Sequence, residues 1–156
     1  MYRTGLGFDI HKFSKKKKDL ILGGIKIPST FGLEAVSDGD VVLHAISDGL
    51  CGACGLGDIG DYFPPSSGKS KEIKSEKIAK FILKKIEKKY KVFNIDITII
   101  AEKPVLSPYK KDILDSLKRL FSLSEINLKI KSKEGLNILG GRNAVACFAI
   151  VLVEKC

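Results

Sequence analysis

The last stretch of the chain constrains the fold most, because it is apolar at almost every position. Residues Ala144 to Val153 read Ala-Val-Ala-Cys-Phe-Ala-Ile-Val-Leu-Val, without a charge, a glycine or a proline. A nearly continuous apolar run of this kind is typical of a strand that is buried on both faces. The sequence therefore predicts a sheet in which this segment is an inner strand.

Alternating apolar and polar side chains predict three more strands. They are Tyr2 to His11, Ile95 to Ile99, and Ile126 to Ile130. The segment Leu20 to Ile27 has the pattern of a short hairpin that turns at Gly23-Gly24.

Helical spacing of apolar residues predicts three helices. The first runs from Asp40 to Cys54 after several N-cap residues, the second from Glu72 to Tyr90, and the third follows Ser107-Pro108. The order of elements predicts an α+β fold over residues 1–156. We expect a single-domain mixed-sheet sandwich with its helices on one face, in a ferredoxin-like arrangement.

The first strand carries a candidate metal site. Its alternation places Asp9 and His11 on one face and Ile10 on the other. The only other histidine, His44, lies in the first predicted helix. One carboxylate and two imidazoles with an open fourth position are the ligand set of a catalytic zinc. The alternative is that one histidine ends a strand and the other packs in the core.

Two more carboxylates, Asp40 and Asp48, fall one helical turn before and after His44. We interpret them as partners that hold the second imidazole nitrogen of His44. The alternative is a solvated acidic face.

The composition is that of a globular protein with a basic surface. Its net charge is +9, and the excess lysines cluster in Lys15 to Lys18 and Lys69 to Lys91. We interpret these runs as solvated, since aromatic residues do not interleave with them as in nucleic-acid grooves. Cys51 and Cys54 are interpreted as small residues on a closely packed helix, without zinc or redox chemistry. No apolar run reaches membrane-spanning length, and the N-terminus resembles neither a signal nor a transit peptide.

Residues 55–65 form a glycine-rich segment in which the backbone can approach a ligand closely. Asp58 and Asp61 are candidates for binding hydroxyl groups there. The spacing is that of neither a P-loop nor a dinucleotide-binding loop.

Taken together, the motifs resemble the 2-C-methyl-D-erythritol 2,4-cyclodiphosphate synthase family, from Arg3 to Val153. The resemblance rests on the following motifs: Gly7-Phe8-Asp9-Ile10-His11, Leu22-Gly23-Gly24-Ile25-Lys26-Ile27-Pro28, Ser37-Asp38-Gly39-Asp40 with Leu43-His44-Ala45, Leu56-Gly57-Asp58-Ile59-Gly60 with Phe63-Pro64, Ala101-Glu102-Lys103-Pro104, and Glu134 with Gly141-Arg142.

The resemblance implies a homotrimer with active sites between subunits. It implies conversion of 4-diphosphocytidyl-2-C-methyl-D-erythritol 2-phosphate to the 2,4-cyclodiphosphate with release of CMP, a step of non-mevalonate isoprenoid biosynthesis. It implies no nucleic-acid or membrane partner. We expect a bacterial cytoplasm, or a plastid stroma after loss of a leader.

The resemblance also implies residue roles. Asp9, His11 and His44 match zinc ligands, Glu134 matches a ligand of Mg²⁺ or Mn²⁺, and Ser132 matches a residue that stabilises the transition state. Further substrate-binding positions are Asp9, Ile10, His11, Val36, Ser37, Asp58, Ile59, Gly60, Phe63, Pro64, Pro65, Ser66, Ser67 and Arg142. Positions for the nucleotide pocket of the adjoining subunit are Ala101, Glu102, Lys103, Pro104, Val105, Leu106, Ser107, Lys131, Ser132, Lys133 and Glu134.

Three positions depart from the family pattern. Val36 replaces a histidine that is assigned to transition-state stabilisation, Pro65 replaces an aspartate, and Val105 replaces a basic residue. We hypothesise that Lys131 and Lys133 compensate by binding phosphate. Two alternatives to the active enzyme are a catalytically weakened metal-binding homologue and a basic nucleic-acid-binding module.

Overall fold

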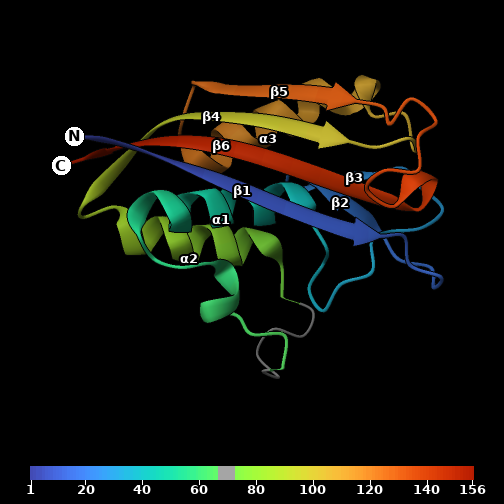
Figure 1. Cartoon of the computed structure of the whole chain (residues 1–156), viewed down its shortest axis with the longest axis horizontal. Helices are drawn as coiled ribbons and strands as arrows, with labels where there is room; N and C mark the ends of the chain where they lie inside the picture. The colour runs from blue at the N-terminus through green and yellow to red at the C-terminus, as the bar shows by residue number, and fades with distance from the viewer. Residues whose placement is uncertain (67–72) are drawn as a thin grey trace.

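The computed structural model describes residues 1–66 and 73–156, and four long strands form its main sheet. These strands are β1 (Tyr2–Lys12), β4 (Tyr90–Ile100), β5 (Ile126–Lys131) and β6 (Ala144–Lys155). Their order is β1-β6-β4-β5, with β6 antiparallel to both neighbours and β4 parallel to β5. The prediction of a mixed sheet with β6 inside it is confirmed (Figure 1).

Helices pack on one face of this sheet, as predicted (Figure 1). They are α1 (Val41–Cys54), α2 (Ser75–Ile86) and α3 (Lys110–Phe121), and 3-10 turns lie at Ile59–Asp61, Ser107–Tyr109 and Gly141–Asn143. The predicted hairpin is present as β2 (Leu20–Leu22) and β3 (Ile25–Ile27). Its turn residues Gly23 and Gly24 have φ of 61° and 80°, which glycine adopts without strain.

The predicted helix from Glu72 to Tyr90 is too long at its C-terminal end. Helix α2 ends at Ile86, because Tyr90 already pairs with Lys155 as the first residue of β4. Glu72 itself lies outside the described residues. The helix expected after Ser107-Pro108 begins with a 3-10 turn, and α3 proper starts at Lys110.

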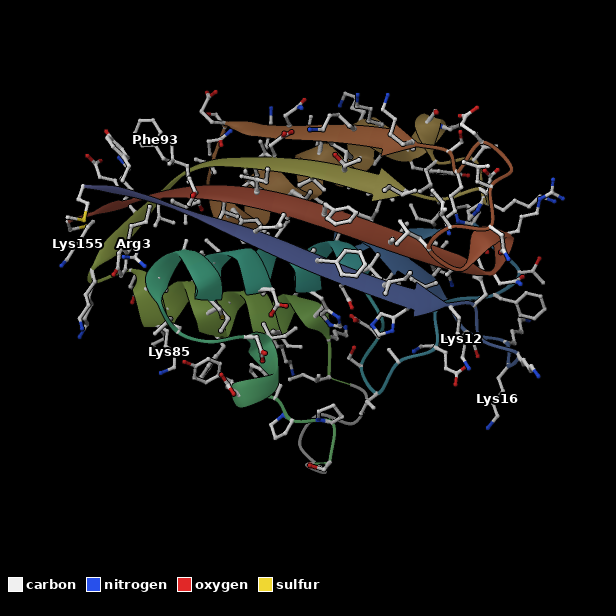
Figure 2. The ribbon with its side chains drawn as sticks, in the orientation of Figure 1. Arg3, Lys12, Lys16, Lys85, Phe93 and Lys155 are labelled. Carbon is white, nitrogen blue, oxygen red and sulfur yellow. The ribbon has the colours of Figure 1, made fainter. Side chains whose placement is uncertain are left out.

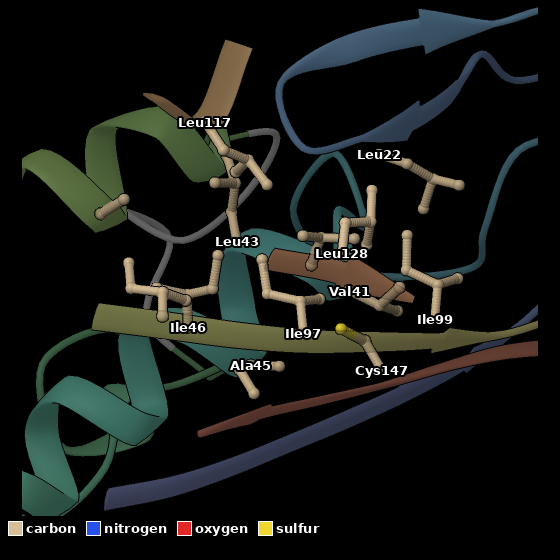
Figure 3. Packing of buried hydrophobic residues seen from close by; sticks show 14 of the residues in the cluster. Leu22, Val41, Leu43, Ala45, Ile46, Ile97, Ile99, Leu117, Leu128 and Cys147 are labelled. Carbon is tan, nitrogen blue, oxygen red and sulfur yellow. The ribbon is translucent and has the colours of Figure 1, made fainter. Parts of the chain in front are cut away.

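The core lies between the helices and the sheet, and Figure 3 shows Ile97 and Cys147 from the sheet facing Leu43 and Ile46 of α1. Cys51 and Cys54 are buried and unpaired, as predicted for small packing residues.

Close contact between α1 and β1 depends on two glycines. A Cβ at Gly7 would lie 1.7 Å from the carbonyl oxygen of Ala45, and one at Gly5 would lie 2.0 Å from that of Gly49. These glycines let α1 approach β1 backbone to backbone, which brings the first turn of α1 beside the end of β1.

The prediction that β6 is buried on both faces is wrong for its second half. Cys147, Ala149 and Val151 face the helices and are fully buried, whereas Ile150 on the other face is 50% exposed. On neighbouring β1, Leu6 is 65% exposed and Phe8 is 40% exposed. Helices cover only one face in a single chain, so the second apolar face of the sheet lies open.

The ferredoxin-like detail is not confirmed. Strands β4 and β5 are adjacent and parallel, and α3 connects them as a simple crossover rather than a split one. Among the described residues, we find no helix long and apolar enough to cross a membrane.

Most lysines among the described residues are exposed, which agrees with their interpretation as a solvated surface; Lys69 and Lys71 lie outside the described residues. Figure 2 shows Lys12 and Lys16 projecting outward near the end of β1, and Lys85 projecting from α2. The ammonium of Lys85 lies 4.9 Å from the ring centre of Tyr62, a cation–π contact.

Candidate metal site and substrate pockets

The end of β1 and the first turn of α1 bring Asp9, His11 and His44 together. One potential ligand atom from each residue lies within 4.8 Å of the other two. Oδ2 of Asp9 lies 2.9 Å from Nδ1 of His44 and 3.2 Å from Nε2 of His11. The strand alternation predicted the pair on β1, and the close packing of α1 supplies the third member.

The electrostatics of the cluster favour an ionised carboxylate at Asp9. Burial alone would raise the pKa of Asp9, but the hydrogen bonds with His11 and His44 hold it well below its usual range. Burial alone would lower the pKa of His44, but Asp9 raises it. An ionised carboxylate and two imidazole nitrogens at this spacing match the donor set of a divalent metal site.

The prediction that Asp40 and Asp48 hold the second imidazole nitrogen of His44 is wrong. Nε2 of His44 contacts two hydroxyls instead, Oγ of Ser75 at 2.9 Å and Oγ of Ser37 at 3.3 Å. Asp40 is the N-cap of α1, and its buried carboxylate accepts hydrogen bonds from backbone amides of α1 and the β2–β3 turn. Asp48 accepts from the amide of Ile59 at 2.9 Å. Helical spacing put these carboxylates near His44, but unpaired backbone donors nearby bind them instead.

No pattern in the sequence pointed to Ser75. It is the first residue of α2, 31 positions beyond His44, and only the tertiary packing of α2 against α1 brings it to the imidazole.

A cavity of about 230 Å³ opens beside the triad. Its predicted lining residues are Asp9, His11, Val36, Ser37, His44, Ile59, Gly60, Phe63 and Pro65, and the structure adds Ala35, Ile73 and Ile78. The glycine-rich segment is thus placed against the metal cluster, where Asp48 anchors it through Ile59.

Some predicted substrate residues are absent from this lining. Asp58 and Asp61 each accept from the other's backbone amide, at 3.2 and 3.3 Å, and both are exposed. Ile10 points to the opposite face of β1, and Pro64 and Ser66 lie beside the cavity residues in the chain. Ser67 lies outside the described residues. Substrate contacts of these residues stay predictions.

A second pocket of about 600 Å³ lies at the other expected binding segment. It is lined by Phe13, Pro28, Ser29, Thr30, Phe31, Lys103, Pro104, Val105, Arg142 and Asn143. The family resemblance implied that Lys103 to Val105 bind a nucleotide and Arg142 a phosphate, and the structure brings these residues together. No sequence pattern pointed to Phe13 and Phe31.

The model of the YgbB family matches residues 2–154. The chain belongs to the YgbB family.

Named relatives of this YgbB chain agree with that assignment. It is 46% identical to the 2-C-methyl-D-erythritol 2,4-cyclodiphosphate synthase of Clostridium acetobutylicum, over 97% of this chain and 99% of the relative. It is 44% identical to the synthase of that name from Treponema denticola, over 97% and 95% of the two chains.

Solved structures are similar over the same length. A 2C-methyl-D-erythritol-2,4-cyclodiphosphate synthase in a CDP-bound form has a TM-score of 0.88 and 35% identity, with 97% of this chain and 100% of that chain covered. The bifunctional IspDF of Campylobacter jejuni has a TM-score of 0.93 and 33% identity. That match covers all of this chain but only 43% of the bifunctional chain.

In this YgbB chain, the three departures from the family pattern all line a pocket. Val36 and Pro65 border the cavity beside the triad, and Val105, which is 71% exposed, borders the second pocket. The candidate metal cluster has all three of its predicted ligands, Asp9, His11 and His44.

The end of β5 carries the remaining predicted residues. The hydroxyl of Ser132 donates to Oε1 of Glu134, and the carboxylate of Glu102 accepts from the amides of Lys133 at 2.7 Å and Gly135 at 3.1 Å. Glu102 therefore ties the segment after β4 to the segment after β5. On either side of the Lys103–Val105 segment, Ala101 and Leu106 are buried, and Ser107 begins a 3-10 turn.

The hypothesis that Lys133 binds phosphate is wrong for this conformation. Its side chain is 1% exposed, and Nζ donates to the carbonyl oxygens of Leu139, Gly141 and Ala144 at 2.6–2.8 Å. Burial lowers the pKa of this ammonium, while Glu102 opposes the shift. Lys133 braces the loop that carries Arg142. Lys131 remains exposed at the end of β5.

Proposed function

We propose that the chain converts 4-diphosphocytidyl-2-C-methyl-D-erythritol 2-phosphate to 2-C-methyl-D-erythritol 2,4-cyclodiphosphate and CMP, in non-mevalonate isoprenoid biosynthesis. The observation that carries this proposal is the convergence of Asp9, His11 and His44 beside a cavity, in a chain whose YgbB match spans residues 2–154. The choice between a bacterial cytoplasm and a plastid stroma stays a prediction.

The triad is the proposed zinc site. The residues fit the ion, since one carboxylate and two imidazoles leave room for a further ligand. Zn²⁺ held there would supply positive charge and Lewis acidity toward a phosphate oxygen. Glu134 is the proposed ligand of a second metal, Mg²⁺ or Mn²⁺, for which carboxylate oxygens are suitable donors.

The remaining groups bind and orient. The reaction displaces CMP when the 2-phosphate attacks the β-phosphorus, so the protein must hold three phosphates in line and offset their charge. Val36, Ile59 and Phe63 form an apolar wall beside the metal cluster that fits the erythritol carbons. Lys103 and Arg142 place positive charge at the second pocket, which suits the cytidine diphosphate end. We assign Ser132 to transition-state stabilisation, next to Glu134.

We further propose a homotrimer with shared active sites. The open apolar face of the sheet, with Leu6, Phe8 and Ile150 exposed, favours burial against other subunits. Subunit complementation tests the shared site. A His44→Ala variant and an Arg142→Ala variant, each inactive alone, should regain CMP release when they are co-refolded, since some interfaces then combine two intact halves. Mixed trimers that stay inactive would argue for sites within one chain.

Neither alternative function is favoured by the comparisons. A basic nucleic-acid-binding module gives no reason for the triad to converge, and a weakened homologue would keep the metal but turn over slowly.

The test of the main proposal is product identity. Purified protein is incubated with the cytidylated substrate and divalent metal, and phosphorus NMR follows the formation of a cyclic diphosphate together with equimolar CMP. Absence of both products at every metal tested would refute the proposed activity.

A further inference from the structure

Behind the proposed metal site, the hydroxyl of Ser75 lies between an imidazole and a carboxylate. Oγ of Ser75 lies 2.9 Å from Nε2 of His44 and donates to Oδ1 of Asp38. The backbone amide of Ser75 donates to Oδ2 of the same carboxylate at 2.9 Å. Ser75 is fully buried, so these partners define its environment.

The proton count along this chain of contacts fixes the direction of each hydrogen bond. An ionised carboxylate only accepts, and a serine hydroxyl carries one proton. The Ser75 proton therefore goes to Asp38, and Oγ of Ser75 must accept from Nε2–H of His44. The second hydroxyl near this nitrogen, that of Ser37, already accepts from the amide of Gly39 at 3.1 Å and is the longer contact.

The opposite nitrogen of the ring, Nδ1, faces Oδ2 of Asp9, 2.9 Å away, and Nε2 of His11 approaches the same oxygen. In the doubly protonated ring, Nδ1–H donates to this carboxylate. When a metal ion takes the place of that proton, Nε2–H stays with Ser75 and the lone pair of Nδ1 faces the ion. The hydrogen-bond chain thus presents Nδ1 as a metal donor.

We propose that Ser75, oriented by Asp38, is a positioning residue that selects the Nε2–H tautomer of His44 and aims Nδ1 at the metal. This inference rests on the zinc site of the proposed function. It adds two residues that touch neither metal nor substrate but set how tightly the triad binds.

The first test is metal affinity, measured by competition with a chromophoric chelator on the full chain. Ser75→Ala should weaken zinc binding about 10–100-fold, the usual effect of losing a partner of a ligating histidine. Ser75→Thr keeps the hydroxyl and should restore affinity. Ser47→Ala is the matched control, because Ser47 is also buried and its hydroxyl has no partner in the part of the chain that the structure describes.

Asp38→Asn gives a sharper test, because it reverses the chain of protons. The amide oxygen faces the backbone N–H of Ser75, which is the closer backbone donor at 2.9 Å, against 3.3 Å for the amide of Asp40, so the NH₂ group faces Oγ. Ser75 then has to donate to Nε2 of His44, which places the neutral imidazole's proton on Nδ1. Nitrogen NMR of the metal-free protein at alkaline pH should show Nε2–H in the parent and Nδ1–H in Asp38→Asn, a change that a purely structural role would not cause.

The outcomes separate this inference from the proposed function. A parent that binds no zinc refutes the metal site and the inference with it. A parent that binds zinc while Ser75→Ala binds it equally well overturns the inference alone, as does an Nδ1–H tautomer in the parent. If Ser75→Ala does not fold, the tautomer of the parent and the affinity of Asp38→Asn decide.

Discussion

Replacing Lys133 by methionine should destabilise the fold and act on catalysis only indirectly. The ammonium of Lys133 donates to three backbone carbonyls of the loop between Leu139 and Ala144. Methionine matches the unbranched stem of lysine as far as Cε and lacks only the terminal nitrogen, so it leaves little empty volume. What it removes is the set of three donors.

The loss in the free energy of unfolding can be worked out from the three lost hydrogen bonds. Leaving a buried polar group unpaired costs about 1–3 kcal/mol, and water can reach part of this loop, because Leu139 is only half-buried. Removal of the buried ammonium also relieves its desolvation. We therefore expect a net loss of about 3 kcal/mol in the free energy of unfolding, which lowers the melting temperature by about 6–12 °C in a domain of this size.

Urea unfolding followed by circular dichroism measures the loss directly. The matched control is Lys131→Met, since Lys131 is exposed two residues earlier and should change stability by less than about 0.5 kcal/mol. If Lys133→Met is as stable as the parent but has a raised KM for the substrate, Lys133 binds phosphate and the structural role argued here is wrong.

Further predictions concern packing, thiols and assembly. Gly7→Ala should prevent cooperative folding, because its Cβ would lie 1.7 Å from a carbonyl oxygen of α1. The control is Gly52→Ala at an exposed position of α1, where the added Cβ meets nothing within 4 Å. This variant should raise the free energy of unfolding by about 0.5–1 kcal/mol in a thermal melt. Burial raises the pKa of Cys51 to about 12, and the thiols of Cys51, Cys54 and Cys147 are all buried. Ellman's reagent at about pH 8 should therefore modify only the exposed Cys156 in the native protein. Rapid reaction of more than one thiol would contradict the packing. Ile150→Lys should turn the proposed trimer into monomers in light-scattering chromatography, because it would bury a charge in the proposed interface. An unchanged mass would place the interface elsewhere.

Local sequence patterns predicted the strands and the start of α1 well, because side-chain alternation and helix capping depend on neighbouring residues alone. Alternation predicted the strands and the opposite facing of Asp9 and Ile10, and the run of N-cap residues up to Asp40 predicted where α1 begins. The exposed face of β6 escaped prediction, because an apolar strand has the same sequence whether its cover is a helix of its own chain or another subunit.

The site was predictable for the ligands but not for the groups around them. Two carboxylates near His44 in the sequence, Asp40 and Asp48, were predicted as its partners, and the structure gives its second nitrogen to Ser75, which is distant in the chain. Lys133 was interpreted by its charge as a phosphate ligand, although it is held by carbonyls. Such assignments depend on which donors and acceptors tertiary packing leaves unpaired, and helical spacing carries no information about that.

The central claim is that the Asp9–His11–His44 cluster supports CMP release by binding a divalent metal. The most direct measurement is the initial rate of CMP release from the cytidylated substrate before chelation, after chelation, and during back-titration with zinc in constant magnesium. We predict that the rate falls to background on chelation and recovers as about one zinc per chain is restored, in line with a single three-ligand site. A rate that survives removal of the metal would contradict the account.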